Sequence, residues 1–474
     1  MFSGTGLQAG LQFAVTITLA RLLTPHDFGV VSAAMVVITF TTIFSLIGVG
    51  PAIIQHPKLN DLHIRTGFLI TVLLSFLFMI GMFLMSPLIA TFFEIPELTL
   101  ILKVLSIMFV TKGFAVISES LVQRKLKFKL LAGINIVSYL TYALVGIVLA
   151  LIGFNYWALV MAQITQSIVK SILLIVTENH SMKFSLHKES AKELLFFGGG
   201  YTIARISNHF ALQADNLVVG KWLGANFLGL YNRAYQLMVM PANLFGQVLD
   251  KVLFPLMAKV QNKKEPLSQS FRVGITSVAF FTIPVSLFIF IYSKEIVLIL
   301  FGKRWLDLMP ALQILSLGLL FRTGYKISDS LARATGAVYR RAWRQVIYAI
   351  MVFFGSWIGH HWGITGVSTG VLLAIVINYI LMTHLSMKFI NLTVVDFIKI
   401  HFPGLFTGIL VVLSVFITSK INIIYNLNDF VLMFISFVLF ATFVFLLFLL
   451  KIDQLLGNEV VWIKNRVLSM IRKK

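Results

Sequence analysis

Residues 104–121 read VLSIMFVTKGFAVISESL, an apolar run that carries two charged side chains. Lys112 and Glu119 are seven residues apart, which places both on one face of a helix. At the centre of a lipid-facing helix, a charged side chain costs about 2.5–3.5 kcal/mol on insertion scales. We therefore expect this face to lie against protein or water. Two arrangements would satisfy it: a polar cavity, or an ion pair that locks neighbouring helices together.

The composition of the whole chain points to a membrane protein. Of 474 residues, 58% are hydrophobic and 12% are charged, and the mean hydropathy is +0.92. Soluble domains carry about 25% charged residues. Apolar stretches of about 20 residues, the length that crosses a bilayer as a helix, recur along the chain. We predict an all-α polytopic protein with about 14 transmembrane helices.

The sequence contains no pattern typical of catalysis or metal binding. Cysteine is absent, which excludes disulfides and thiolate metal sites. The GGG at 198–200 lacks the GK[ST] of a phosphate loop, and adjacent histidines in GHHWG (359–363) form a poor metal site. We expect no enzyme activity, no cofactor and no metal.

The formal net charge of +21 is explained by membrane topology rather than by nucleic-acid binding. Lys and Arg concentrate in the even-numbered connections between predicted helices, and cytoplasmic loops collect these residues. We therefore expect both termini and the even-numbered connections of this multi-pass protein to be cytoplasmic; the resemblance described below implies that the membrane is the bacterial inner membrane.

The opening stretch has a second copy. Residues 314–331 read ILSLGLLFRTGYKISDSL, and Lys112 and Glu119 fall on Arg322 and Asp329 at a constant offset, 322 − 112 = 329 − 119 = 210. Earlier, ARLLTPHDFGVV (20–31) falls on GKWLGANFLGLY (220–231). We interpret this as a duplication of six helices, so that both copies run in the same direction across the membrane.

The duplication predicts the domain organisation. We expect two parallel six-helix lobes around a central cavity, two further helices and a basic tail. The predicted segments are an N-lobe (1–177), a cytoplasmic linker (178–193), a C-lobe (194–388), two extra helices (389–451) and an amphipathic cytoplasmic tail (452–474).

Charged and polar residues within apolar spans are the candidate cavity residues. Cations outnumber acids there, and a cationic cavity favours an anion such as phosphate. The predicted cavity cations are Lys112, Arg205, Arg322 and Lys326. A polar stripe, YTIARISNHFALQADN (201–216), and the two repeated acids supply candidates for a polar lining or ion coupling: Glu119, Asn208, His209, Asp215, Asn216 and Asp329.

Three stretches carry a family resemblance: ARLLTPHDFGVVSAAMVV, QADNLVVGKWLGANFLGLYNRAYQL and MPANLFGQVLDKVLFPLMAKVQ. They resemble polysaccharide-export flippases of the Wzx type, in the multidrug/oligosaccharidyl-lipid/polysaccharide (MOP) superfamily. The resemblance implies a polyprenyl-pyrophosphate-linked oligosaccharide as substrate, such as an O-antigen, capsule or exopolysaccharide unit. It adds Arg21, at the family's A-R-L-L position, to the substrate-binding candidates.

The resemblance also implies interaction partners and leaves alternative functions open. Membrane lipids, a polysaccharide polymerase and chain-length machinery are the expected partners, nucleic acid is not, and a monomer is expected to function alone. A lipid II flippase is a close alternative, and a cation-coupled multidrug exporter of the same superfamily is another. A polymerase or ligase of the same pathway would need a large external loop, which the sequence lacks.

Overall fold

The computed structural model describes residues 2–449 and residue 459, and every regular element in this part of the chain is helical. The predicted tail at 452–474 therefore lies outside the described residues, apart from Glu459. Contacts divide the chain into two compact units. The first contains residues 1–232 and 300–304, and the second contains residues 233–299 and 305–474.

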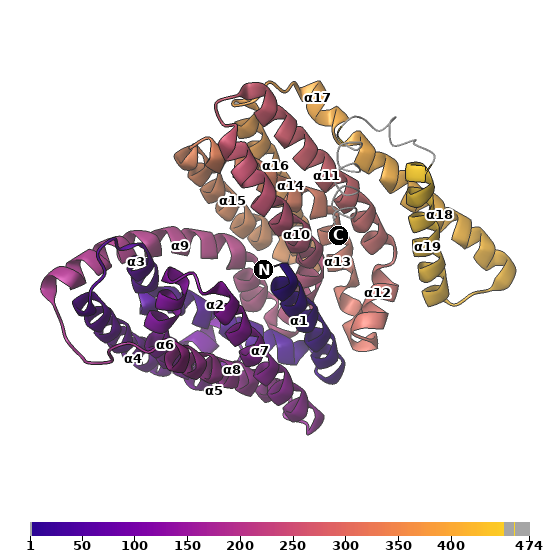
Figure 1. Cartoon of the computed structure of the whole chain (residues 1–474). Helices are drawn as coiled ribbons and strands as arrows, with labels where there is room; N and C mark the ends of the chain where they lie inside the picture. Colours follow the sequence, from indigo (N-terminus) through magenta and orange to yellow (C-terminus); the bar gives the residue numbers. More distant parts are fainter. Residues whose placement is uncertain (1, 450–458, 460–474) are drawn as a thin grey trace. The chain divides into compact units, whose positions relative to one another are not determined.

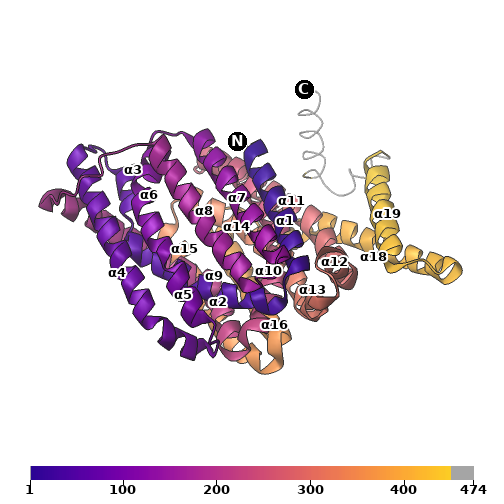
Figure 2. The ribbon, with the colours of Figure 1, turned by 90° about the horizontal axis from the view of Figure 1, so that it is seen from below.

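The helices of the first unit account for the N-terminal half (Figure 1). They are α1 (Phe2–Leu22), α2 (Pro25–Leu46), α3 (Val49–Gln55), α4 (Asp61–Phe93), α5 (Leu98–Leu105), α6 (Ile107–Arg124), α7 (Phe128–Leu151), α8 (Tyr156–Thr177) and α9 (Lys188–Trp222). Helix α6 packs against α4 and α8, and α7 packs against α8 and α1. Figure 2 shows α6, α7 and α8 side by side.

The second unit repeats this construction. Its helices begin with α10 (Gly224–Lys259), whose first residues belong to the first unit, and continue with α11 (Lys264–Ile291), α12 (Ser293–Leu300), η1 (Lys303–Leu308), α13 (Met309–Leu317), α14 (Leu319–Ala334), α15 (Val338–Gly359), η2 (His360–Trp362) and α16 (Gly363–Met387). Three more helices follow: α17 (Val394–Lys399), α18 (Phe402–Tyr425) and α19 (Asp429–Leu449). Helix α18 packs against α11 and α19 against α18.

Helix bounds recur at the offset found in the sequence. Helix α7 begins at Phe128 and α15 at Val338, and α8 ends at Thr177 and α16 at Met387. Each pair differs by 210 (338 − 128 and 387 − 177). The pairings α6–α8 and α7–α8 recur as α14–α16 and α15–α16. Bounds and packing therefore agree with the duplication inferred from matched charges.

The predicted all-α polytopic fold is confirmed. Within the described residues, 9 helical stretches are long and apolar enough to cross a membrane, or 10 if the bent pair α13–α14 counts as one span. One of these stretches, residues 338–387, contains the two helices α15 and α16. The polar helices α1, α9 and α10 are not among the stretches that pass this test, because their apolar runs are interrupted by Gly, by Gln or Asn, and by charged residues.

One predicted span is broken. Hydropathy alone predicts a single helix over residues 28–54, but α2 ends at Leu46 and α3 begins at Val49. Ile47 and Gly48 adopt positive φ of 37° and 63°. A Cβ on Gly48 would collide with the backbone of Gly198 in α9. The chain therefore turns at a point where its backbone lies close to that of α9, a tertiary contact that hydropathy cannot predict.

Helix α9 belongs to the first compact unit. It packs against α2, α3 and α4, and this unit extends to Asn232. The connection 178–187, between α8 and α9, contains no helix. It is fixed to α4 through Thr66, whose Oγ1 donates to the carbonyl of Ser185 at 3.2 Å and accepts from the amide of His187 at 3.0 Å.

Candidate functional site

Two neighbouring cavities in the first unit form the candidate site. The larger has a volume of about 540 Å³, and the smaller about 280 Å³. Lys112 and Glu119 of α6 line both. The larger cavity is also lined by polar side chains of α2, α6 and α9: Thr39, Thr42, Gln123, Tyr201, Thr202 and His209. The smaller one adds Gln163, Gln166 and Lys170 of α8.

Close packing behind α6 orients its charged face. Gly113 follows Lys112, and a Cβ at Gly113 would collide with the side chain of Ser75 in α4. Thr71 of α4 donates a hydrogen bond to the carbonyl of Gly113 at 3.2 Å. The glycine side of α6 is pressed against α4, and Lys112 and Glu119 lie on the part of α6 that lines the cavities. Both side chains line the same two cavities.

The ion pair in this site joins helix α6 to helix α8. Glu119 Oε1 accepts from Lys170 Nζ of α8 at 2.9 Å, and both side chains are about one-third exposed. Lys112 forms no hydrogen bond or ion pair with another residue of the described part of the chain. The two ammonium groups face one carboxylate, so the formal charge of this cluster is +2 − 1 = +1. Lys112 thus lines both cavities and is not part of the Glu119–Lys170 ion pair.

The repeated residues of the second unit have different partners. The guanidinium of Arg322 lies 4.9 Å from the ring centroid of Tyr235 and donates to the hydroxyl of Tyr348 at 3.3 Å. Lys326 Nζ donates to Asn243 Oδ1 at 3.1 Å and to the carbonyl of Ala242 at 3.3 Å. Both cations are therefore held between α14 and neighbouring helices of their own unit.

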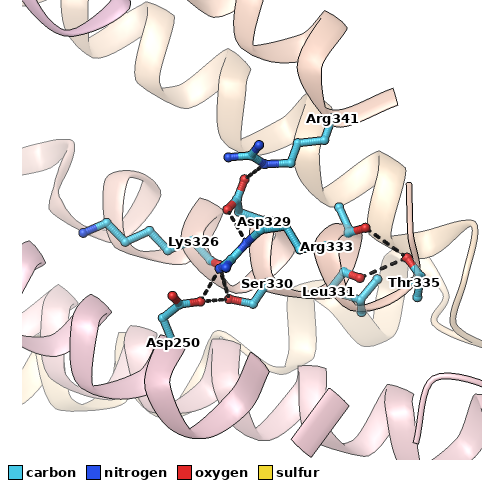
Figure 3. A network of polar contacts seen from close by, with 9 residues as sticks. Asp250, Lys326, Asp329, Ser330, Leu331, Arg333, Thr335 and Arg341 are labelled. Atoms are coloured by element: carbon cyan, nitrogen blue, oxygen red, sulfur yellow. Dashed lines mark hydrogen bonds and ion pairs between the residues drawn. The ribbon is translucent and has the colours of Figure 1, made fainter. Parts of the chain in front are cut away.

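Asp329 belongs to a closed network of opposite charges rather than pairing with Arg322 (Figure 3). Arg333 donates to Asp329 at 3.1 Å and also to Asp250, and Arg341 donates to Asp329. Ser330 donates to Asp250. These ion pairs join α14 to α10 and to α15, so they lock neighbouring helices together. Their cations are Arg333 and Arg341.

The polar stripe of α9 divides into two groups. His209 lines the larger cavity, with its ring 5.9 Å from that of Phe40. Asp215 is buried instead (2% exposed), and its carboxylate accepts from the hydroxyl of Tyr231 at 2.7 Å. Asn216 is buried beside it and donates to Gln213 at 2.9 Å. The side chains of Arg205 and Asn208 lie outside the described part of the structure.

Arg21 is not among the residues that line either cavity. It is exposed, and its Nε donates to the carbonyl of Leu300 at 3.2 Å. The motif around it is largely structural. Thr24 and Asp27 form a capping box that begins α2, and a Cβ on Gly29 would fall on the carbonyl oxygen of Ala225.

The cavities are also lined by residues that are not in the predicted site set. Lys170 pairs with Glu119, and Gln163 and Gln166 lie on the same helix at spacings of seven and four residues from it. This i, i+3, i+7 polar stripe on an otherwise apolar helix was a usable signal. Thr39 and Thr42 gave none, since threonine is common in membrane helices and can bond to the carbonyl one turn earlier, as Thr42 does with Ile38 at 2.7 Å.

The architecture defines the class of protein first. Over 95% of this chain and 98% of the other, the fold matches the lipid II flippase MurJ, with a TM-score of 0.77 and 17% sequence identity. A multidrug resistance MATE family transporter of the MOP superfamily matches 80% of this chain and 94% of its own length, with a TM-score of 0.64 and 17% identity. The chain therefore shares its fold with these two proteins.

The family follows from the sequence comparison. Residues 18–310 match the family described as polysaccharide biosynthesis protein, and the chain belongs to this family. It is 28% identical over 391 residues to the lipopolysaccharide biosynthesis protein WzxC of Escherichia coli K12, covering 80% of this chain and 78% of that protein. It is 24% identical over 310 residues to the succinoglycan biosynthesis transport protein ExoT of Rhizobium meliloti, covering 65% and 62%. The family predicted from the sequence is confirmed.

Proposed function

We propose that this protein is a flippase that moves a polyprenyl-pyrophosphate-linked oligosaccharide across the membrane, and that it is not an enzyme. The family, the names of the relatives and the MOP fold support the class of activity. The observation that carries the substrate chemistry is Lys112, an ammonium group that lines both cavities and forms no ion pair with a carboxylate of the described residues. A diphosphate is the anion that such a group would hold.

The cavity suits a glycosylated head group as well as a phosphate. Hydroxyl and amide side chains from α2, α6, α8 and α9 line it, and such groups can hydrogen bond to sugars in many orientations. The lipid tail would remain in the bilayer while the head group crosses. We include Arg21, Arg205, Arg322 and Lys326 in the proposed binding set, and Glu119, Asn208, His209, Asp215, Asn216 and Asp329 as polar or ion-coupling residues.

The remaining expectations are part of this proposal. The two lobes would alternate access to a central cavity, both termini would be in the cytoplasm, and the membrane would be the bacterial inner membrane. The chain would function as a monomer and pass its product to a polysaccharide polymerase with its chain-length machinery. The lobe limits at residues 177, 194 and 388 belong to the same scheme.

The comparisons support the two alternative functions, lipid II flippase and multidrug exporter, to different extents. A lipid II flippase is favoured by the extent of the MurJ match, which covers 95% of this chain. The family match to polysaccharide biosynthesis proteins favours an export oligosaccharide instead. A multidrug exporter is disfavoured because the MATE match covers only 80% of the chain, and because the cluster at Glu119 carries a net positive charge.

The test is replacement of Lys112. We expect Lys112→Ala to reduce surface polysaccharide at least about tenfold, which corresponds to about 1.4 kcal/mol of lost binding. Lys112→Arg, which keeps the charge, should retain most of the activity. The assay is complementation of a strain that lacks its own copy, with the amount of protein in the membrane measured in parallel.

Lys103→Ala is the matched control. Lys103 lies on α5 with its Nζ 4.7 Å from the ring centroid of Phe83, and it lines neither cavity. It should export at the wild-type rate. Normal export by Lys112→Ala would contradict a cationic binding site at this position. Restoration of growth in a strain depleted of its lipid II flippase would identify the rival substrate.

A further inference from the structure

Two histidines and one glutamate converge at one end of the first unit. His56 directly follows α3, His63 lies in the first turn of α4, and Glu193 lies near the start of α9. Glu193 Oε2 is 2.7 Å from His63 Nε2 and 3.1 Å from His56 Nε2. The candidate ligand atoms of the three residues all lie within 4.8 Å of one another. None of these residues is part of the proposed substrate site.

Hydrogen bonding indicates which ring nitrogen of His63, the more buried of the two histidines, carries a proton. Asn60 Oδ1 accepts from the backbone amide of His63 at 3.0 Å, which identifies this atom as the amide oxygen. The same oxygen lies 2.6 Å from His63 Nδ1, so Nδ1 must carry a proton and donate it. In the neutral ring, Nε2 then presents a lone pair to the carboxylate of Glu193. Two lone pairs at 2.7 Å repel unless a proton or a metal cation lies between them.

The surroundings resemble a metal centre more than a chance contact. A metal-binding histidine ordinarily donates its second ring N–H to an oxygen, as His63 does to Asn60. The side chain of His63 is 8% exposed and that of His56 is 19% exposed, whereas Glu193 reaches solvent. Arg124 anchors the backbone here by donating to the carbonyl of His56 at 2.7 Å. The cluster is therefore ordered on its protein side and open on one side, where water can complete a coordination shell.

We propose that His56, His63 and Glu193 bind one divalent transition-metal ion of the zinc class, through two imidazole Nε2 atoms and a carboxylate oxygen, with water as the fourth ligand. Imidazole and carboxylate ligands in a set of three suit Zn²⁺ in tetrahedral coordination. The ion would join the end of α3 and the start of α4 to the start of α9. Since Tyr201, Thr202 and His209 of α9 line the larger cavity, the ion would restrain the helix that forms one cavity wall.

The experiment measures metal binding by the full-length protein in detergent, after its purification tag is removed and bound metal is stripped with a chelator. Titration with Zn²⁺ is followed by elemental analysis after gel filtration, and titration with Co²⁺ by its visible absorption spectrum. We expect one equivalent per chain and a tetrahedral Co²⁺ spectrum. His63→Gln should lose the equivalent and the spectrum.

Matched variants separate ligand loss from misfolding. His26→Gln, which alters a histidine 3.9 Å from Glu97, should retain full binding. Asn60→Ala should weaken binding about 10–100-fold, the usual effect of removing a group that orients a metal ligand. Asn60→Asp keeps the acceptor for His63 and should bind as tightly as the wild type. Each variant is compared with the wild type by gel filtration and by metal-free thermal unfolding.

Two results would overturn the proposal. One is the absence of a stoichiometric metal ion in the wild type, which would mean that a proton bridges His63 and Glu193. The other is equal binding by the wild type and His63→Gln. Neither result concerns the flippase proposal, because export with an intact Lys112 is measured separately.

Discussion

At the scale of single residues, Glu178 is a carboxylate that tertiary contacts bury. It directly follows α8, is 5% exposed, and accepts hydrogen bonds from Lys125 and from Lys127, the latter at 2.9 Å. Burial alone would raise the pKa of this carboxyl. The two lysines more than offset burial, so that the pKa of Glu178 lies below its ordinary value. The pair of lysines joins the α6–α7 connection to the start of the linker.

We predict that Glu178→Gln lowers the free energy of unfolding by about 1 kcal/mol at neutral pH, a modest value because both lysines are half exposed. A lowered pKa means that the contribution is present above the pKa of the unfolded state and is lost as the pH falls through the lower folded-state value. The difference between variant and wild type should therefore vanish in acid. Thermal unfolding of both proteins in detergent at several pH values measures this difference in stability.

The exposed Glu189 offers the control for this measurement. Glu189→Gln should change stability little at any pH, because its side chain is solvated in the first turn of α9. A difference between Glu178→Gln and the wild type that persists below the pH at which carboxylates are protonated would contradict the electrostatic explanation.

For charged residues within the apolar spans, spacing along the chain predicts the helix face but not the ion-pair partner. The seven-residue separation of Lys112 and Glu119 was sufficient to place both on one cavity wall. It could not identify Lys170 as the partner of Glu119, or Arg333 and Arg341 as the partners of Asp329. These partners come from other helices or from the next turn, and opposite charges combine with whichever neighbour the packing brings within reach.

At the scale of elements, close helix crossings explain part of the family motif. A Cβ on Gly29 of α2 would fall on the carbonyl of Ala225, and a Cβ on Gly229 of α10 would fall on the carbonyl of Pro25. The two backbones are in direct contact, as small residues permit in membrane helices. Gly29 and Gly229 are also the positions that the sequence repeat aligned with one another.

We predict that Gly29→Ala separates α2 from α10 and destabilises the protein by about 1–3 kcal/mol, the usual cost of overpacking. Gly81→Ala is the matched control, since Gly81 lies in α4 at a position where an added Cβ would meet open space. That change should be neutral or slightly stabilising. Thermal unfolding and the yield of monodisperse protein report both, and equal stability of the two variants would refute the contact.

At the scale of the whole molecule, the distribution of Lys and Arg predicts which connections face the cytoplasm. The chain has no cysteine, so a single introduced cysteine reports its own location. Lys183 lies in the linker that we place in the cytoplasm, and Lys420 near the end of α18 lies on the side that we place outside; both are exposed.

We predict that a membrane-impermeant maleimide labels Lys420→Cys in intact cells, whereas it labels Lys183→Cys only after lysis. Labelling of both variants after lysis controls for reactivity of the thiol. The reverse pattern in intact cells would invert the proposed topology, and with it the side from which substrate enters.

The amino-acid sequence by itself determined the class of this protein. Apolar runs of membrane-spanning length, a repeat marked by charges within those runs, and family motifs were sufficient for the all-α fold, the duplication and the family, because these features are local or periodic. The structure alone decided which charges pair, where α2 breaks, and that His56, His63 and Glu193 meet. Residues 130 and 137 positions apart come together only through helix packing, and no spacing along the chain encodes that distance.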